Sequence, residues 1–321
     1  MRAALLQRPG EISVGEAPDV EPGPGEVRVR VRGVGLCGSD MSVFSGRWKP
    51  PSYPWVMGHE AFGVIDVAGD GVSSDRVGET VVVEPNAVCF SCPPCEAGLT
   101  SACQNRRSVG MNRIGALADL LVVPSDYAWP TTIDDPETLA CVEPLTVVSA
   151  AFRRLARPLP DRALVVGLGP QGLLMSLVLL SRGVRVFGVD VNGERLAFAT
   201  SLGIGAIGED GPFPLAVDTV GSPEAHATAV EHVEIGGALL VLGFDDRPMG
   251  TSSTTLVRRQ LTLRGSLTYD HPRDFRATLD LLAGDDIAPR RVVTRAYDIE
   301  DVQQAFDEGS TAAGKTWIRL D

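Results

Sequence analysis

The segment around residues 163–190 restricts the possible fold more than any other part of this chain. A short apolar run, residues 163–166, leads into Gly167-Leu168-Gly169-Pro170-Gln171-Gly172, and a further apolar stretch continues to about Ser181. A second strand-like run, residues 184–190, ends in Asp190. A glycine-rich turn between a strand and a helix, followed about 20 residues later by an acid, predicts a dinucleotide-binding βαβ unit.

Each part of this unit has a chemical reason. The glycines let the backbone approach a pyrophosphate, and the N-terminus of the following helix favours the negative charge of that group. Asp190 can accept hydrogen bonds from both ribose hydroxyls of an adenosine, and its charge disfavours a 2′-phosphate. The predicted cofactor is therefore NAD.

Residues 145–285 continue this pattern. Further parallel strands are predicted at residues 215–221, 238–243 and 261–266, which gives a doubly wound α/β domain. The candidate cofactor-binding residues come from the glycine-rich turn and from these strands: Gly167, Gly169, Pro170, Gln171, Gly172, Asp190, Val220, Gly243 and Ser266.

The remainder of the chain is predicted to be mostly β-structure. Residues 27–32 alternate valine and arginine, so one face of that strand is apolar and the other is charged. Residues 61–67, 79–83 and 115–124 add strands separated by Gly and Pro turns. We expect a barrel-like antiparallel domain made of residues 1–144 and 286–321.

Four of the six cysteines fall within fifteen residues, as Cys89-x2-Cys92-x2-Cys95-x7-Cys103. Four thiolates at such spacing form a closed tetrahedral site that usually holds zinc structurally. An iron–sulfur cluster is the competing interpretation, but a ferredoxin-type motif has its fourth Cys after three residues and then Pro. The lobe of residues 86–110 is predicted to hold structural zinc in place of a core.

A second set of metal-ligand residues surrounds Cys37 and His59. Each is flanked by glycine, and each is followed closely by an acid, Asp40 or Glu60. Thiolate, imidazole and carboxylate are the common ligands of catalytic zinc. A buried free cysteine with an unrelated surface histidine is the alternative. Glu143, among apolar neighbours, is either a helix N-terminal acid favoured by the dipole or a third metal ligand.

Charge and hydropathy limit the partners and the location. The formal net charge of −12 argues against a nucleic-acid or anionic-membrane partner. The first nine residues contain too short an apolar run for a signal peptide, and the longest apolar run, residues 173–180, is too short for a membrane span. We expect a cytoplasmic protein.

Taken together, these motifs resemble the zinc-containing medium-chain dehydrogenase/reductases, the alcohol dehydrogenase superfamily, over nearly the whole length. The resemblance rests on residues 37–40, 58–60, 115–124 and 143–145, on the cysteine lobe, on the glycine-rich turn with Asp190, and on Gly314-Lys315. Glu143 stands where typical alcohol dehydrogenases carry a second cysteine ligand. That makes the chain more similar to the sorbitol, threonine and butanediol dehydrogenase branch.

The resemblance implies a GroES-like catalytic domain and a Rossmann NAD-binding domain. It also implies a catalytic zinc on Cys37, His59 and a carboxylate, either Glu60 or Glu143. Ser39 would take the proton of the substrate hydroxyl, and Asp40 would orient the zinc imidazole. Hydride would pass between NAD and a secondary alcohol of a polyol, sugar or cyclitol, in a homodimer or homotetramer.

Two alternatives remain open. One is an NADH-dependent ketone reductase of a biosynthetic pathway, which would use the same site. The other is a non-catalytic NAD-binding protein, against which the intact Cys37, His59, Glu143 and Ser39 argue.

Three further observations concern single segments. Relatives often carry a histidine five residues after the catalytic cysteine, as a proton relay, whereas this chain has Ser42. Residues 203–215 are shorter than in relatives, so the nucleotide domain is expected to lack a peripheral helix. The other histidines, His226, His232 and His271, are predicted to be ordinary surface or loop residues.

Overall fold

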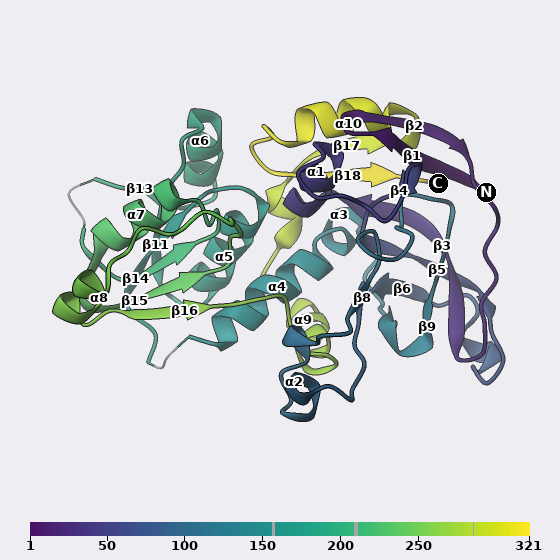
Figure 1. The fold of residues 1–321 in the computed structure, drawn as a ribbon, viewed down its shortest axis with the longest axis horizontal. Helices are drawn as coiled ribbons and strands as arrows, with labels where there is room; N and C mark the ends of the chain where they lie inside the picture. Colours follow the sequence, from purple (N-terminus) through teal and green to yellow (C-terminus); the bar gives the residue numbers. More distant parts are fainter. Residues whose placement is uncertain (156–157, 209–210, 285) are drawn as a thin grey trace. The chain divides into compact units, whose positions relative to one another are not determined.

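The computed structural model describes residues 1–155, 158–208, 211–284 and 286–321. These residues form two compact units (Figure 1). The first unit contains Met1–Glu143 and Val293–Asp321, and the second contains Pro144–Val292. The sequence predicted these divisions after residues 144 and 285.

A seven-stranded sheet dominates the first unit, in the order β10-β6-β5-β3-β18-β17, with β9 also paired to β3. Its strands are β3 (Glu26–Gly35), β5 (Glu60–Ala68), β6 (Thr80–Val83), β9 (Leu120–Pro124), β10 (Ala128–Pro130), β17 (Val293–Asp298) and β18 (Lys315–Arg319). All pairs are antiparallel except β17 with β18. Because β18 pairs with β3, both ends of the chain contribute to one sheet (Figure 1).

Valine and arginine alternate along β3, and their side chains lie on opposite faces of the strand, as predicted. Val27, Val29 and Val31 are at most 2% exposed and belong to the core of this unit. Arg28 and Arg30 both bind the Asp66 carboxylate, with Nε–Oδ1 and Nη2–Oδ2 distances of 2.9 and 3.1 Å. The period of two therefore separates an apolar face from a charged one.

Smaller elements complete the first unit. A second sheet contains β1 (Arg2–Arg8), β2 (Glu11–Glu16) and β4 (Trp55–Val56), and a third pairs β7 (Asn86–Ala87) with β8 (Arg107–Ser108). The helices are α1 (Gly38–Phe44), α2 (Pro93–Glu96), α3 (Pro136–Leu139) and α10 (Val302–Gly309). Single 3-10 turns lie at Ser74–Arg76, Thr100–Ala102, Ser125–Tyr127 and Ile299–Asp301.

The second unit is built on a six-stranded parallel sheet in the order β13-β12-β11-β14-β15-β16. Its strands are β11 (Arg162–Val166), β12 (Arg185–Val189), β13 (Gly205–Ala206), β14 (Phe213–Asp218), β15 (Val233–Val241) and β16 (Thr262–Gly265). The helices are α4 (Val142–Arg153), α5 (Pro170–Ser181), α6 (Gly193–Ser201), α7 (Pro223–His232), α8 (Ser253–Arg259) and α9 (Arg273–Leu282), with a 3-10 turn at Pro289–Val292. The predicted doubly wound sheet is confirmed.

The glycine-rich turn owes its spacing to close packing between β11 and α5. A Cβ atom on Gly172 would lie 1.9 Å from the carbonyl oxygen of Gly167, which no side chain can tolerate. Gly167 itself has a φ of +88°, in the left-handed region that favours glycine. Both positions are therefore restricted to glycine by this fold.

Two expectations for the second unit can be compared with the described residues. Between α6 and β14, only the two-residue strand β13 is present among them, while residues 209–210 of the shortened segment lie outside the described residues. The prediction for His226 is wrong, because its side chain is completely buried on α7. The face that α7 turns toward the sheet could not be read from its mixed composition.

No helix among the described residues has the length and apolar character needed to cross a bilayer.

Candidate functional site

The end of β3 and the start of β5 bring three metal-ligand side chains together. Cys37 precedes α1, His59 immediately precedes β5, and Glu60 is the first residue of β5. The thiol, an imidazole nitrogen and a carboxylate oxygen of these residues all lie within 4.8 Å of one another. Gly35 of β3 pairs with Glu60 of β5, so strand register brings together residues that are more than 20 positions apart.

The Asp40 carboxylate contacts both Cys37 and His59 and holds them in place. Its Oδ2 accepts the Cys37 N–H at 2.9 Å, and its Oδ1 lies 3.1 Å from His59 Nδ1. The carboxylate thereby assigns the ring proton to Nδ1 and leaves the lone pair of Nε2 for a metal. Ser39 Oγ lies 3.5 Å from that Nε2.

The electrostatics of His59 follow from its surroundings. Burial disfavours the charged imidazole, but the Asp40 carboxylate and the Cys37 thiol outweigh it, so the pKa of His59 lies well above its usual value. A cation on Nε2 would take the place of that extra proton.

Glu60 has a partner that the sequence did not reveal. Its Oε2 accepts from the Lys315 ammonium, and both side chains are 1% exposed. Lys315 Nζ also donates to the Leu36 carbonyl at 2.9 Å. Burial lowers the pKa of Lys315, but the charge of Glu60, followed by Cys37 and Cys141, raises it overall. Glu60 Oε1 is buried without a hydrogen-bond partner among the described residues.

Glu143 lies in the first turn of α4 and is 4% exposed. It is not a member of the group formed by Cys37, His59 and Glu60. Its place in the first turn agrees with the interpretation as a helix N-terminal acid, whereas its role as a metal ligand stays a prediction.

Ser42, at the position of the relay histidine, is 2% exposed and fully engaged. Its hydroxyl donates to the Gly38 carbonyl at 3.0 Å and accepts from the Arg47 guanidinium. A hydroxyl has one proton to donate, so Ser42 has none left for a substrate.

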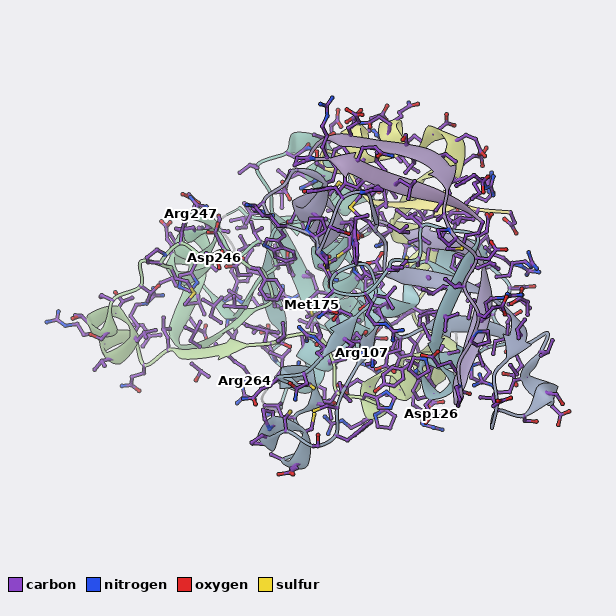
Figure 2. The ribbon with its side chains drawn as sticks, turned by 45° about the vertical axis from the view of Figure 1, so that its right-hand side comes forward. Arg107, Asp126, Met175, Asp246, Arg247 and Arg264 are labelled. Carbon is purple, nitrogen blue, oxygen red and sulfur yellow. The ribbon has the colours of Figure 1, made fainter. Side chains whose placement is uncertain are left out.

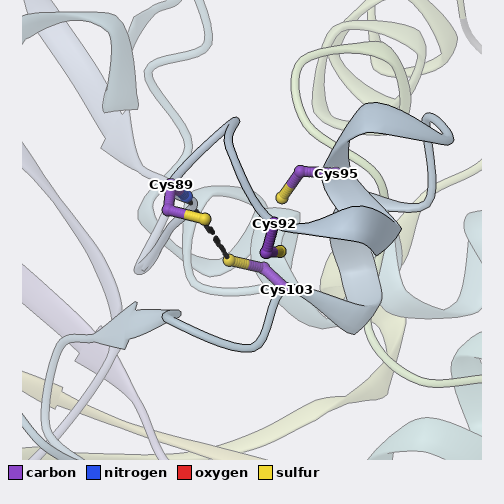
Figure 3. Close-up of side chains that lie close together, drawn as sticks. All are labelled: Cys89, Cys92, Cys95 and Cys103. Carbon is purple, nitrogen blue, oxygen red and sulfur yellow. Dashed lines mark hydrogen bonds between the residues drawn. The ribbon is translucent and has the colours of Figure 1, made fainter.

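The four cysteines of the lobe converge as predicted from their spacing (Figure 3). Their sulfur atoms all lie within 4.8 Å of one another, and none is in a disulfide. Cys103 and Cys89 sulfurs are 3.6 Å apart, joined by the dashed line in Figure 3. Backbone and hydroxyl hydrogen bonds from Ser91 lower the pKa of Cys89 to about 5, whereas burial and the neighbouring thiols raise that of Cys95 to about 12. A cation bound among the sulfur atoms would offset the burial and the thiol hydrogen bonds that keep Cys95 protonated.

The predicted dinucleotide residues occupy the carboxyl edge of the parallel sheet. Gly169, Pro170, Gln171 and Gly172 lead from β11 into α5. Gly169 has no atom within 4 Å of where a Cβ would lie, so the space beside this backbone is open. An open cradle at a helix N-terminus fits a pyrophosphate.

Asp190 already holds two backbone groups in place. Its Oδ2 accepts the Leu168 N–H at 2.7 Å, and its Oδ1 accepts the Asn192 N–H at 2.8 Å. Arg195, which the sequence analysis missed, has Nη1 at 3.9 Å from the same carboxylate. The feature of the sequence that could have identified Arg195 is its position, five residues after Asp190.

Val220, Gly243 and Ser266 follow three neighbouring parallel strands. Gly243 and Gly221 are in direct contact, since a Cβ on Gly221 would lie 2.4 Å from the Gly243 carbonyl carbon. Ser266 is 8% exposed, and its Oγ accepts from Arg154 Nη1 at 2.6 Å. Val220 and Gly243 therefore lie together, and Ser266 is tied to Arg154, the residue that follows α4.

Comparison with known proteins agrees with these features. Residues 23–133 match the alcohol dehydrogenase GroES-like domain. The starvation-sensing protein RspB of Escherichia coli is 31% identical over 95% of this chain and 94% of that protein. The D-altritol 5-dehydrogenase of Agrobacterium fabrum is 30% identical over 95% of both chains.

A solved structure gives the same result for the whole fold. The crystal structure of an E. coli alcohol dehydrogenase in complex with NADH superimposes with a TM-score of 0.91 at 28% identity, covering 100% of this chain and 99% of that one. The chain belongs to the zinc-containing medium-chain dehydrogenase/reductase family, as its motifs predicted.

Proposed function

We propose that this protein is a zinc- and NAD-dependent dehydrogenase that interconverts a secondary alcohol of a polyol, sugar or cyclitol and the corresponding ketone. The observation that carries the proposal is the group of Cys37, His59 and Glu60 with the Ser39 hydroxyl beside it. The name of the D-altritol 5-dehydrogenase supports a polyol class of substrate.

The donor sets fit zinc at both places. One thiolate, one imidazole and one carboxylate suit a site that keeps a position for substrate, and four thiolates suit a closed structural site. Glu60 Oε1, buried and unpartnered among the described residues, has the unmet bonding capacity expected of a metal ligand. When bound, zinc supplies Lewis acidity toward the substrate oxygen, and NAD supplies the hydride acceptor.

The protein's own groups orient the substrate and manage its proton. We propose that Ser39 Oγ receives the hydroxyl proton of the alcohol, because it lies next to the nitrogen that faces the metal position. Asp40 keeps that nitrogen aimed by holding the other side of the His59 ring. Ser42 is committed to Gly38 and Arg47, so the onward route for the proton bypasses it.

For the cofactor, we propose NAD over NADP. Gly169 and Gly172 receive the pyrophosphate, and Asp190 repels a 2′-phosphate while accepting ribose hydroxyls. Arg195 stands against strict exclusion, because its guanidinium lies close to the same position.

The cysteines and the edge of the parallel sheet bear on the location and the assembly of the protein. None of the six cysteines is in a disulfide, which fits the reducing cytoplasm. We also propose a homo-oligomer, because β16 forms the end of the parallel sheet and its four residues are all exposed.

A substrate panel tests the function. Purified protein loaded with zinc is expected to form NADH with at least one polyol or sugar alcohol, more efficiently than it forms NADPH, as measured by nicotinamide absorbance. Ser39→Ala should lower kcat by roughly 10²–10⁴-fold, the usual size of a lost acid–base contribution. Ser42→Ala, the matched control, should retain most of kcat.

The same panel can contradict the proposal. A protein that binds zinc and NADH but neither oxidises any alcohol nor reduces any ketone of the panel would be a non-catalytic NAD-binding protein. A Ser42→Ala variant as impaired as Ser39→Ala would place Ser42 in the proton route after all.

A further inference from the structure

A histidine lies completely buried beneath the loops that follow β14 and β15. His226 is 0% exposed on α7, a helix capped by Ser222, and none of the proposed chemistry uses it. Its Nε2 lies 2.6 Å from the Thr251 hydroxyl. Burial lowers the pKa of this imidazole, against an opposing effect of the Asp218 carboxylate, so the ring is neutral at neutral pH.

Asp218 lies at the carboxyl end of β14 and ties the two loops to each other. Its Oδ1 accepts the Val220 and Gly221 N–H groups at 2.9 and 2.8 Å. Its backbone carbonyl accepts from the N–H groups of Leu242 and Gly243 at 2.8 and 3.2 Å. The segments that carry Val220 and Gly243 are therefore held by one residue.

Asp218 and His226 each keep one unsatisfied buried atom. Asp218 Oδ2 and His226 Nδ1 have no hydrogen-bond partner within the part of the chain that the structure describes. The Asp218 carboxylate acts on the charge of the His226 ring, so the two groups lie within electrostatic range of each other. The loop ends and α7 thus form one polar cluster beneath the cofactor edge.

The segment from residue 244 to 252 follows β15 and is held to α7 by side-chain contacts. It is largely exposed, with Phe244 at 61% and Met249 at 39%. Arg247, which extends from this segment in Figure 2, reaches Glu224 of α7 at 3.3 Å, but both side chains are exposed and their attraction is weak. The His226–Thr251 contact ties the same segment to α7 from within the protein.

We propose that His226 is a positioning residue for the dinucleotide: by holding Thr251 it fixes the exposed segment 244–252, which continues from Gly243 at the cofactor edge of the sheet. The inference rests on the proposed function, since it assumes that a nicotinamide dinucleotide binds at these loops. It predicts that His226 contributes to cofactor affinity through the Thr251 hydroxyl and touches neither substrate nor cofactor.

The test is NADH affinity, measured by fluorescence titration of the zinc-loaded protein without substrate. His226→Leu is expected to raise the Kd for NADH about tenfold, the factor that corresponds to one lost hydrogen bond. His226→Gln, whose amide can replace Nε2, should retain most of the affinity. Thr251→Val should weaken NADH binding like His226→Leu, and the double variant should be no weaker than either single one.

His232→Leu is the matched control. His232 lies on the same helix, but its Nδ1 bonds the Thr228 carbonyl one turn earlier on that helix, so NADH affinity should not change. At saturating NAD, kcat of His226→Leu should stay within about twofold of the unmodified protein. The variant is expected to lose cofactor binding energy that the ground state and the transition state share equally.

Several results would overturn the inference. A lower Tm for His226→Leu with unchanged NADH affinity would make the histidine a packing residue only. Should that variant fail to fold, Thr251→Val decides, because an unchanged Kd there removes the proposed contact from cofactor binding. Unmodified protein that binds NADH but turns over no substrate would contradict the proposed function and leave this inference standing.

Discussion

Glu60 and Lys315 form a buried ion pair beside the proposed catalytic metal ligands. A charged pair in the interior stabilises a protein only while both members are present, because a single charge left behind is not solvated. Lys315 also donates to the Leu36 carbonyl, immediately before Cys37. The ammonium therefore holds both the carboxylate and the backbone that leads into the metal site.

Lys315→Met is expected to lower the free energy of unfolding by about 3–5 kcal/mol, the usual cost of breaking a buried pair from one side. The measurement is denaturant unfolding of the metal-free protein. The double variant Glu60→Gln/Lys315→Met should be more stable than Lys315→Met alone, because it leaves no unpaired charge.

Lys49→Met serves as the control, since it removes an exposed lysine and should change stability by less than about 0.5 kcal/mol. Equal effects of the two lysine variants would show that the pair contributes nothing.

Individual residues were predictable where the chemistry is local. Cys37, His59 and Glu60 could be grouped because glycines and acids flank them, and the cysteines of the lobe because their spacing is that of a zinc site. Lys315 could not be paired with Glu60, since 255 residues separate them and only the pairing of β18 with β3 brings them together. The burial of His226 likewise depends on how α7 packs.

Among the secondary-structure elements, those with a clear period or flanking motif were the predictable ones. β3 follows from alternation, and β11, α5 and β12 follow from the glycine-rich motif. Helix α1 was not predicted, because its seven residues include Gly38 and Ser39 and carry no apolar period. It is held by the Asp40 carboxylate at its first turn and by burial of Val43 and Phe44.

The cysteine lobe is an element with almost no core of its own. Its two strands have two residues each, and its buried cluster consists of Cys92, Cys95 and Cys103 with little else around them. Metal bonds must then replace apolar burial as the source of its stability.

Cys103→Ser should therefore reduce the zinc content from two per chain to one and lower Tm by roughly 10 °C or more. Metal analysis and thermal unfolding of the same samples measure both effects. Cys141→Ala removes a completely buried thiol that is not in the lobe, and it should keep two zinc ions. A fully folded Cys103→Ser variant with unchanged Tm would show that the lobe needs no metal.

At the scale of the whole molecule, the order of the strands is what the sequence could not provide. The first unit combines residues from both ends of the chain, with β18 between β3 and β17. Local patterns predict that a strand exists but do not state its neighbours, which depend on contacts between distant segments. For the parallel sheet, the glycine-rich motif predicted a doubly wound α/β domain, but the order of its six strands came from the structure.

That sheet ends in a strand suited to association. β16 pairs with β15 on one side, and no strand of the described residues pairs with its other side. Its four residues are exposed, including Leu263 at 38%, and the preceding helix α8 has no buried residue and exposes Val257 at 74%. Figure 2 shows Arg264 at this strand. An exposed edge strand with one unpaired side is a liability that a second copy of the chain would remove by isologous pairing.

Leu263→Lys is therefore expected to convert the protein to a smaller assembly, because symmetric pairing would bring two ammonium groups together at the edge. Light scattering on a sizing column, or sedimentation velocity, measures the mass. Val77→Lys is the control: it places the same charge on another exposed apolar residue, 47% exposed and in the first unit, and should not change the mass. An unmodified protein that is monomeric would contradict the proposed oligomer, whereas an unchanged mass for Leu263→Lys would place the interface away from β16.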